Sequence, residues 1–224
     1  MSIDVDALDL DGLADAAERA ARAGGEVLRR YFGSVAEVRA KAPGDWVSEA
    51  DLESEAVVRS VLAAPAPDIA FFGEETGGTH AELGWYVDPL DGTSNYLHGF
   101  DAVGVSVALV ASERPIVGVV HAPFLDRTYR ARLGGGAWRD GQPIRVSGRP
   151  VDQAICATGF PFRRKDDLSG PYLAALAAAF ETFEDLRRPG AASLDLCWVA
   201  EGVFDGFFEL ALGTWDVAAG ALLV

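Results

Sequence analysis

The residues best suited to chemistry begin with a short acidic stretch at residues 85–96. It contains two carboxylates, Asp88 and Asp91, which are three residues apart and follow an apolar and aromatic run. Such a run is typical of a buried strand, so we expect both acids at a strand end. Pro89 fixes its own φ and favours an extended Asp88, and Gly92 permits a close approach of backbone or ligand. A rigid, open loop is therefore expected.

The residues after Asp91 suggest an anion-binding element. Gly92 and Thr93 are consistent with a helix start, which would direct their N–H groups outward from the positive end of the helix dipole. Magnesium prefers carboxylate oxygens, so acids beside such a helix end suit a metal-bridged phosphate. The alternative is an ordinary Asp-rich turn, because Asp, Pro and Gly also dominate turns that have no function.

Further acids lie at the ends of other predicted elements. Glu74 and Glu75 follow an apolar run, and Asp216 falls in the first turn of the last predicted helix. Asp51 lies three residues after Ser48, a spacing typical of a capping box. Each has a structural alternative: a solvated loop for the glutamates, complementarity to a helix dipole for Asp216, and a helix cap for Asp51.

The composition limits the class of protein. The chain has 224 residues, 50% of them hydrophobic, which is enough for one compact unit of one or two lobes. Its formal net charge of −15 argues against direct binding to nucleic acid or an anionic membrane. No window suits a membrane span and the acidic N-terminus lacks a signal-peptide pattern, so we expect a cytoplasmic protein. Cys156 and Cys197 are interpreted as buried thiols.

Hydrophobic periodicity predicts helices and strands that are segregated along the first part of the chain. Helices are expected at 5–32 and 52–62. Strands are expected at 69–72, 85–87, 103–110, 116–121 and 128–132. Apolar alternation at 103–109 predicts an antiparallel sheet with one buried face, and glycine-rich turns at 134–136 and 140–141 predict a meander.

The pattern changes after Pro150. We expect, in order, a strand at 154–158, helices at 172–183 and 191–200, a strand at 203–209 and a helix from Trp215. This order favours a second layered lobe. The chain is therefore divided into residues 1–145, with the N-terminal helices, the antiparallel sheet and most candidate metal ligands, and an α/β lobe at residues 146–224.

Taken together, the motifs resemble the signature set of the inositol monophosphatase family. In order they are Lys41-x-x-x-Asp45-x-x-Ser48-x-x-Asp51, Gly73-Glu74-Glu75, Asp88-Pro89-Leu90-Asp91-Gly92-Thr93-x-Asn95-Tyr96 and Trp215-Asp216-Val217-Ala218-Ala219-Gly220. Four motifs in one order are far more specific than any one of them. Stretches at 157–162, 194–197 and 205–209 are similar to the bacterial branch, so the resemblance covers nearly the whole chain.

The resemblance implies a magnesium site that holds two or three ions. Glu74, Asp88 and the backbone carbonyl of Leu90 match the ligands of one ion. Asp88, Asp91 and Asp216 match those of a second ion, and Glu74 would help to hold a weaker third.

The resemblance also implies roles in catalysis and substrate binding. Asp51 and Thr93 match the pair that orients and activates the attacking water, which is general-base assistance without histidine. The N–H groups of Gly92 and Thr93 would hold the phosphate. Lys41 matches no direct ligand, although its positive charge could offset part of the negative charge of the acidic cluster. The candidate catalytic residues are Asp51, Thr93 and Glu74, and the candidate substrate contacts are Asp91, Gly92, Thr93, Ala192, Glu209 and Asp216.

Two features depart from the family pattern. Relatives usually carry Gly-Ser-Ala-Ala or Gly-Thr-Ala-Ala where this chain has Gly-Ala-Ala-Ser at 190–193, which moves the hydroxyl two places and leaves the substrate preference open. The sequence also ends at Val224, within the last predicted helix, whereas family members continue further. The end is interpreted as a truncation that leaves the second lobe incomplete.

The resemblance implies the layered αβαβα sandwich of the sugar phosphatase superfamily, an α+β or α/β fold, and a homodimer. The expected activity is magnesium-dependent hydrolysis of a small polyol or cyclitol phosphate, with inositol monophosphate as the first candidate. Histidinol phosphate, a sugar bisphosphate and adenosine bisphosphate are alternative substrates. A regulatory binding protein of transcription antitermination complexes is the alternative from another class, but the intact set of acids favours the enzyme.

Overall fold

The computed structural model describes residues 3–42 and 45–224. Four residues lie outside this part of the chain: Met1, Ser2, Pro43 and Gly44. The side chains of Ala42 and Asp45 also lie outside it, so parts of the N-terminal stretch and of the first family motif are not described. In the described part, no helix is long and apolar enough to cross a membrane.

The largest layer is an eight-stranded mixed sheet. Its strands are β3 (Ala70–Gly73), β4 (Gly77–Gly78), β5 (Leu83–Asp91), β6 (Gly104–Ala111), β7 (Arg114–Ala122), β8 (Arg127–Arg132), β9 (Gly136–Arg139) and β10 (Gln142–Pro143). They lie in the order β10-β9-β8-β7-β6-β5-β3-β4, and only the neighbours β3 and β5 run parallel. The predicted meander through β8, β9 and β10 is confirmed.

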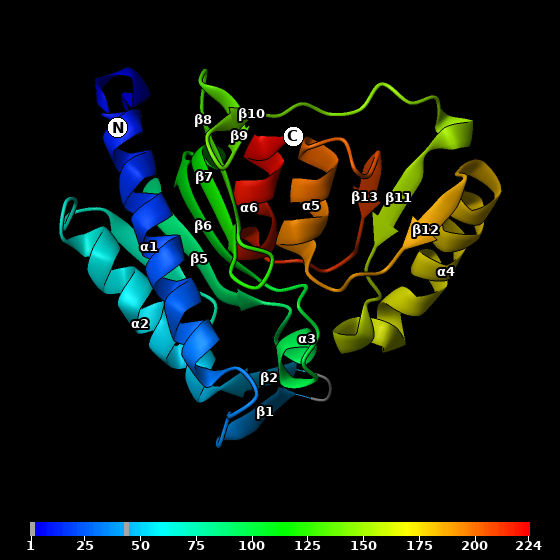
Figure 1. Cartoon of the computed structure of the whole chain (residues 1–224), viewed down its shortest axis with the longest axis horizontal. Helices are drawn as coiled ribbons and strands as arrows, with labels where there is room; N and C mark the ends of the chain where they lie inside the picture. The colour runs from blue at the N-terminus through cyan, green and yellow to red at the C-terminus, as the bar shows by residue number, and fades with distance from the viewer. Residues whose placement is uncertain (1–2, 43–44) are drawn as a thin grey trace.

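Helices cover both faces of this sheet (Figure 1). The helices α1 (Leu10–Tyr31) and α2 (Glu49–Ala63) pack on one face, and α5 (Ala192–Ala200) and α6 (Thr214–Leu223) pack on the other. Every residue of β6 is consequently buried, so the expectation of a single buried face is wrong. Val105 and Val107 belong to the core under α1 and α2, whereas Ala108 and Val110 belong to the core under α5 and α6.

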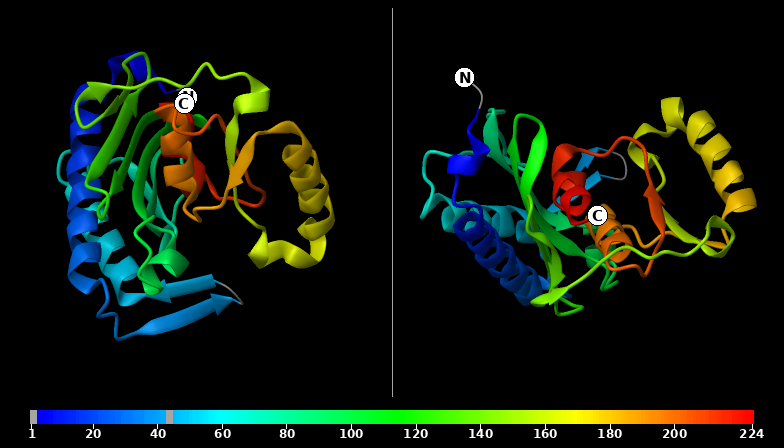
Figure 2. Two further views of the ribbon diagram at one scale, coloured as in Figure 1. Left: turned by 45° about the vertical axis from the view of Figure 1, so that its right-hand side comes forward. Right: turned by 90° about the horizontal axis from the view of Figure 1, so that it is seen from above.

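A smaller sheet and a further helix complete the stack. The parallel strands β11 (Ile155–Thr158), β12 (Asp185–Arg187) and β13 (Gly206–Phe208) lie in the order β12-β11-β13, and α4 (Lys165–Thr182) lies on their far side. The right-hand view of Figure 2 shows the five layers in sequence, from α1 and α2 to α4. The predicted αβαβα sandwich is confirmed. The division at residue 145 stays a prediction.

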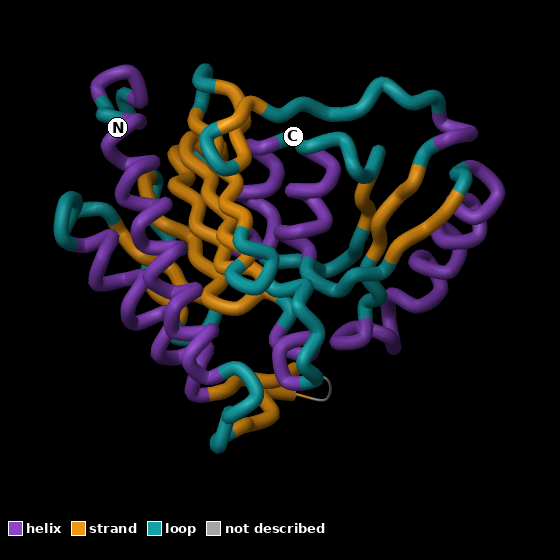
Figure 3. The backbone as a smooth tube through the Cα atoms, viewed as in Figure 1, coloured by secondary structure: helices purple, strands orange, loops and turns teal. Residues whose placement is uncertain are grey.

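The remaining elements lie at one end of the large sheet. They are the hairpin of β1 (Val38–Ala42) and β2 (Asp45–Ser48) and the short helix α3 (Thr93–Leu97). Figure 3 shows loops converging between this end of the sheet, α3 and the small sheet. Short 3-10 turns occur at Val5–Ala7, Val151–Gln153 and Phe162–Arg164.

Several predicted boundaries change for local reasons. The first helix begins at Leu10 because Asp9 caps it, with Oδ1 accepting the Gly12 N–H at 3.0 Å, and the residues before it form a separate 3-10 turn. Strand β5 was expected to end at residue 87, but its pairing with β6 continues to Asp91 across an irregularity in register. No sequence pattern predicted β12, β4 or the hairpin of β1 and β2, all of which are short.

Helix α6 rests directly on β7 at Gly118. A Cβ atom at this glycine would lie 2.7 Å from the carbonyl oxygen of Ala219 and 3.0 Å from its Cα. Because these are backbone atoms of α6, only a shift of the whole helix could relieve the contact. The bare backbone at Gly118 therefore sets how closely α6, and with it Asp216, approaches the sheet.

We expect Gly118→Ala to lower the free energy of unfolding by about 1–3 kcal/mol through overpacking. Gly148→Ala is the matched control, since a Cβ there meets nothing within 4 Å, and its effect should stay within about 0.5 kcal/mol. Urea unfolding monitored by circular dichroism measures both. Equal stability of the two variants would contradict the direct packing of α6 on β7.

Candidate active site

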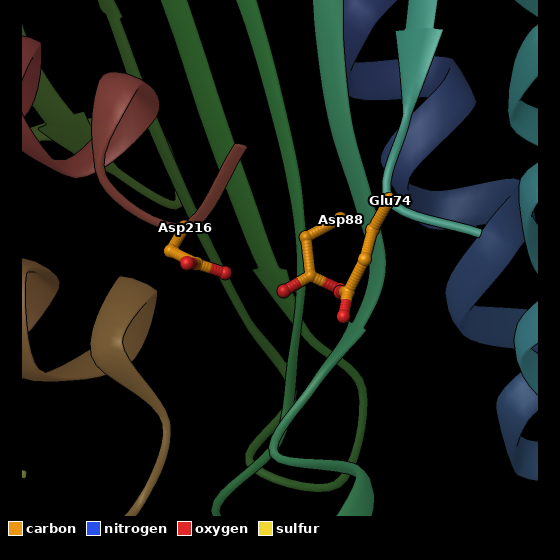
Figure 4. Close-up of side chains that lie close together, drawn as sticks. All are labelled: Glu74, Asp88 and Asp216. Carbon is orange, nitrogen blue, oxygen red and sulfur yellow. The ribbon is translucent and has the colours of Figure 1, made fainter. Parts of the chain in front are cut away.

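Three carboxylates from three elements meet at one end of the large sheet. Strands β3 and β5 run parallel with Gly73 opposite Val87, so the residues that follow, Glu74 and Asp88, lie side by side. The Glu74 N–H donates to the Val87 carbonyl at 3.0 Å. One oxygen each from Glu74, Asp88 and Asp216 lie within 4.8 Å of one another. Figure 4 shows Asp216, in the first turn of α6, facing the other two carboxylates.

These acids lie in a cavity of about 500 Å³. The volume is within the range of small-molecule sites. All candidate site residues except Asp51 line it: Glu74, Asp88, Leu90, Asp91, Gly92, Thr93, Ala192, Glu209 and Asp216. The fold thus gathers into one cavity residues that are spread over more than half of the sequence.

Asp91 is held by the start of α5. Its Oδ2 accepts hydrogen bonds from the Ser193 N–H at 2.7 Å and from the Ser193 Oγ at 2.6 Å. The helix needs this acceptor because its own N-cap residue, Ala191, has no side-chain oxygen. The serine that departs from the family pattern therefore fixes the orientation of a candidate metal ligand.

Asp51 serves as a helix cap and also contacts Thr93. Its Oδ2 accepts the Ser48 N–H at 2.8 Å and the Ser48 Oγ at 2.6 Å, which confirms the predicted capping box of α2. The Thr93 hydroxyl lies 3.3 Å from Asp51 Oδ1 and 3.1 Å from the Leu90 carbonyl oxygen, and can donate to either. Helix α3 starts after Gly92, rather than at Asp91, and the φ of 91° at Gly92 explains the glycine.

Burial and mutual repulsion favour the neutral form of these acids. Burial, together with nearby carboxylates, raises the pKa values of Asp91 and Asp216 to about 7 and that of Asp88 well above its usual range. Burial also raises the pKa of Glu209 to about 7. Excess negative charge in a buried site raises the pKa of a carboxyl group in this way, and a bound cation would lower the pKa again.

Lys41 forms ion pairs with the two glutamates at this cluster. Its Nζ donates to Glu74 Oε1 at 3.1 Å and to Glu75 Oε1 at 2.8 Å. Burial lowers the pKa of Lys41, but the two glutamates outweigh that effect and raise it. The lysine thus offsets part of the acidic charge, as expected from the sequence.

The donor set fits a hard divalent cation. Glu74, Asp88 and Asp216 supply clustered carboxylate oxygens, and the same cavity is lined by Asp91 and Leu90. Oxygen-only donors of this kind suit magnesium or manganese rather than softer metals. The clustering of like charges is unfavourable without a cation, so the site is built for one.

The cavity also has a basic and aromatic lining. Its lining residues include Arg163, Arg188, Phe160 and Phe162. The Arg188 guanidinium lies 5.7 Å from the ring centroid of Phe160 and 5.6 Å from that of Phe162, within range of cation–π attraction. The sequence analysis assigned no role to these residues. Pairs of arginines are visible in the sequence, but nothing local indicates which of them faces the acids.

Comparisons with known proteins agree on one family. The sequence model described as the inositol monophosphatase family matches residues 9–224. The chain is 41% identical over 215 residues to the fructose-1,6-bisphosphatase/inositol-1-monophosphatase of Aquifex aeolicus, spanning 94% of this chain and 81% of the relative. It is 38% identical over 212 residues to the Nus factor SuhB of Haemophilus influenzae, spanning 92% and 79%.

A solved structure shows the same fold. The crystal structure of the extragenic suppressor protein suhB from Bartonella henselae matches with a TM-score of 0.89 at 35% sequence identity. The match covers 95% of this chain and 84% of that one.

The raised pKa values predict how stability depends on pH in the metal-free protein. Asp91 and Asp216 titrate near 7 when folded and near 4 when unfolded, so between these values the unfolded chain has released protons that the folded state keeps. Their contribution to stability is fully present below about pH 4 and is lost as the pH rises through about 7. The melting temperature should fall over this window, and less steeply in Asp216→Asn.

The effect of magnesium on the melting temperature provides a check. The ion should raise it more at pH 8 than at pH 5, because protons compete for the same carboxylates at the lower pH. Differential scanning calorimetry at both pH values, with and without magnesium, measures the difference. An equal shift at both would contradict cation binding by these acids.

Proposed function

Because the chain belongs to the inositol monophosphatase family of metal-dependent phosphomonoester phosphatases, we propose that it hydrolyses a small polyol phosphate with magnesium. Inositol monophosphate is the first candidate substrate. The observation that most supports this proposal is the clustering of Glu74, Asp88 and Asp216 in one cavity with Thr93.

In the proposal, the acids hold two or three magnesium ions. Glu74, Asp88 and the Leu90 carbonyl would bind one ion, and Asp88, Asp91 and Asp216 a second, with Glu74 also contributing to a third. Bound magnesium supplies Lewis-acid polarisation of the phosphoryl group and neutralises the charge that develops on the oxygens. The Ser193 hydrogen bonds are both made to Oδ2 of Asp91, and Oδ1 would be the oxygen offered to a ligand.

Thr93 and Asp51 are the proposed pair that prepares the attacking water. The Thr93 hydroxyl lies in the cavity and within 3.3 Å of Asp51. When the hydroxyl donates to Asp51, its oxygen can accept a hydrogen bond from water and orient it toward phosphorus. Ser48 holds Asp51 in position for this contact through two hydrogen bonds.

The substrate itself is proposed to bind along the same cavity. The N–H groups of Gly92 and Thr93 would hold the phosphate at the start of α3. Asp91, Ala192 and Glu209 would contact the hydroxyl groups of the ring, since carboxylates and backbone groups accept from or donate to a polyol. Asp216 would hold a metal ion and also contact the substrate.

The expected partners and location stay predictions. We expect the protein to form a homodimer, to be located in the cytoplasm and not to bind nucleic acid directly. One relative is named a Nus factor, and a regulatory binding role remains the alternative of another class.

We expect Asp91→Asn to lower kcat/KM for magnesium-dependent phosphate release from inositol 1-phosphate by about 100-fold or more. The amide oxygen can still accept from Ser193, so the fold should survive. The matched control is Asp126→Asn, an exposed aspartate with a positive φ that asparagine tolerates, and it should keep full activity. A colorimetric phosphate assay measures release, and circular dichroism checks the fold. Full activity in Asp91→Asn would contradict the proposal.

A sugar bisphosphate is the second candidate substrate, because the lining of the cavity also contains arginines. Arg163 lies 4.0 Å from Glu74, and the guanidinium of Arg188 lies 5.7 and 5.6 Å from the centroids of two phenylalanine rings. An arginine held in this way can bind a second phosphate without a metal. The name of the Aquifex relative includes fructose-1,6-bisphosphatase, which is consistent with this candidate.

Arg188→Ala tests the choice between the two substrates. If a bisphosphate is bound, its KM should rise by about 10-fold or more, because a charge-assisted hydrogen bond is worth about 1.5–3 kcal/mol, while the KM for inositol 1-phosphate changes little. The control is Arg187→Ala, which removes the neighbouring arginine that pairs with Asp185. Steady-state kinetics on both substrates measure the effect. Equal changes for the two substrates would count against a second phosphate at Arg188.

A further inference from the structure

Helix α2 presents three buried polar side chains to three separate parts of the site. Asp51 contacts Thr93, as described above. Ser54 donates from Oγ to the carbonyl oxygen of Pro89 at 3.0 Å, in the irregular part of β5 between Asp88 and Asp91. Glu55 contacts the turn that follows β3. Ser54 and Glu55 lie three and four residues after Asp51, which puts all three side chains on one face of the helix.

Glu55 binds the turn after β3 with both carboxylate oxygens. It is only 1% exposed, and Oε2 accepts the Glu75 N–H at 2.9 Å while Oε1 accepts the Thr76 N–H at 3.1 Å. The Thr76 hydroxyl also donates to Oε1. A Cβ atom at Gly73 would lie 2.2 Å from Oε2, so a side chain at this position would push the Glu55 carboxylate away from its present place.

These contacts fix the backbone of Glu74 from both sides. The Glu74 N–H is held by the Val87 carbonyl, and the next two N–H groups in the chain are held by Glu55. With the turn fixed in this way, Glu74 faces Asp88, and Glu75 lies against Lys41.

We infer that Glu55 is a positioning residue that sets the metal affinity of the cluster by holding the turn that carries Glu74. The inference rests on the proposed function in one respect, namely that Glu74, Asp88 and Asp216 bind a metal. A carboxylate is required at this position because two N–H groups and a hydroxyl all donate to it. An amide would turn its own NH2 group toward one of these donors, which would release one side of the turn.

The main test is the affinity for Mn²⁺ alone, measured by electron paramagnetic resonance as the loss of the free-ion signal. Glu55→Gln keeps the size of the side chain, and we expect it to weaken Mn²⁺ binding by ~10- to 100-fold, the usual effect of removing a group that orients a metal ligand. Half-maximal activity should then need a correspondingly higher metal concentration, with kcat at saturating metal nearly unchanged. Reduced stability alone would not raise the metal requirement while leaving kcat at saturating metal nearly unchanged.

The matched control is Glu53→Gln on the same helix. Glu53 points away from the site and bonds to Arg30 and to the Tyr31 hydroxyl, so its variant should bind Mn²⁺ like the wild type. Thr76→Val removes the hydroxyl that donates to Glu55 and accepts from Arg59, and a smaller loss of affinity is expected. All binding is measured well below the melting temperature of each variant.

These measurements distinguish the positioning role of Glu55 from metal binding by the acidic cluster. Wild-type affinity in Glu55→Gln would overturn the positioning role alone. If that variant does not fold, wild-type affinity in Thr76→Val overturns it instead. A wild-type protein that binds no Mn²⁺ would overturn the proposed metal site, and the positioning role with it.

Discussion

Repulsion among closely spaced carboxylates is the constraint on which the rest of this structure depends. Glu74, Asp88, Asp91 and Asp216 line one cavity, and two like charges 4 Å apart repel by about 4 kcal/mol at the effective dielectric constant of a protein surface. Such a cluster cannot form from flexible loops, because the loops would move apart. It requires rigid elements that force the acids together and polar groups that hold each one in place.

Helix ends supply many of these polar groups. Asp51, Asp91 and Asp216 each accept an N–H at the start of a helix, from Ser48, Ser193 and Gly213 respectively. The positive end of a helix dipole also favours a nearby carboxylate. These acids can therefore cap helices and also serve in the site, because the hydrogen bonds that begin the helices also orient the candidate ligands.

The sheet supplies the rigidity. Because helices cover both faces, β5 and β6 are fully packed where the acids emerge, and α6 meets β7 through bare backbone at Gly118. The hydrophobic pattern of the sequence predicts less packing than the structure has. Alternation at 103–109 indicated one buried face, but the intervening residues are small or apolar as well, and a second helical layer covers them. Periodicity within one strand does not reveal a layer that is contributed by the far end of the chain.

The sequence by itself determined the local features and the inventory of acids. The capping box at Ser48 and Asp51, the turns of the meander and the residue types of the motifs depend on neighbours within a few positions, so their signals can be read along the chain. Tertiary structure alone decided which groups meet. Ser193 and Asp91 are 102 residues apart, and the contact of Glu55 with Thr76 spans 21. Such pairs form only because helices dock on the sheet at particular angles, and that docking is a property of the packed core rather than of any local pattern.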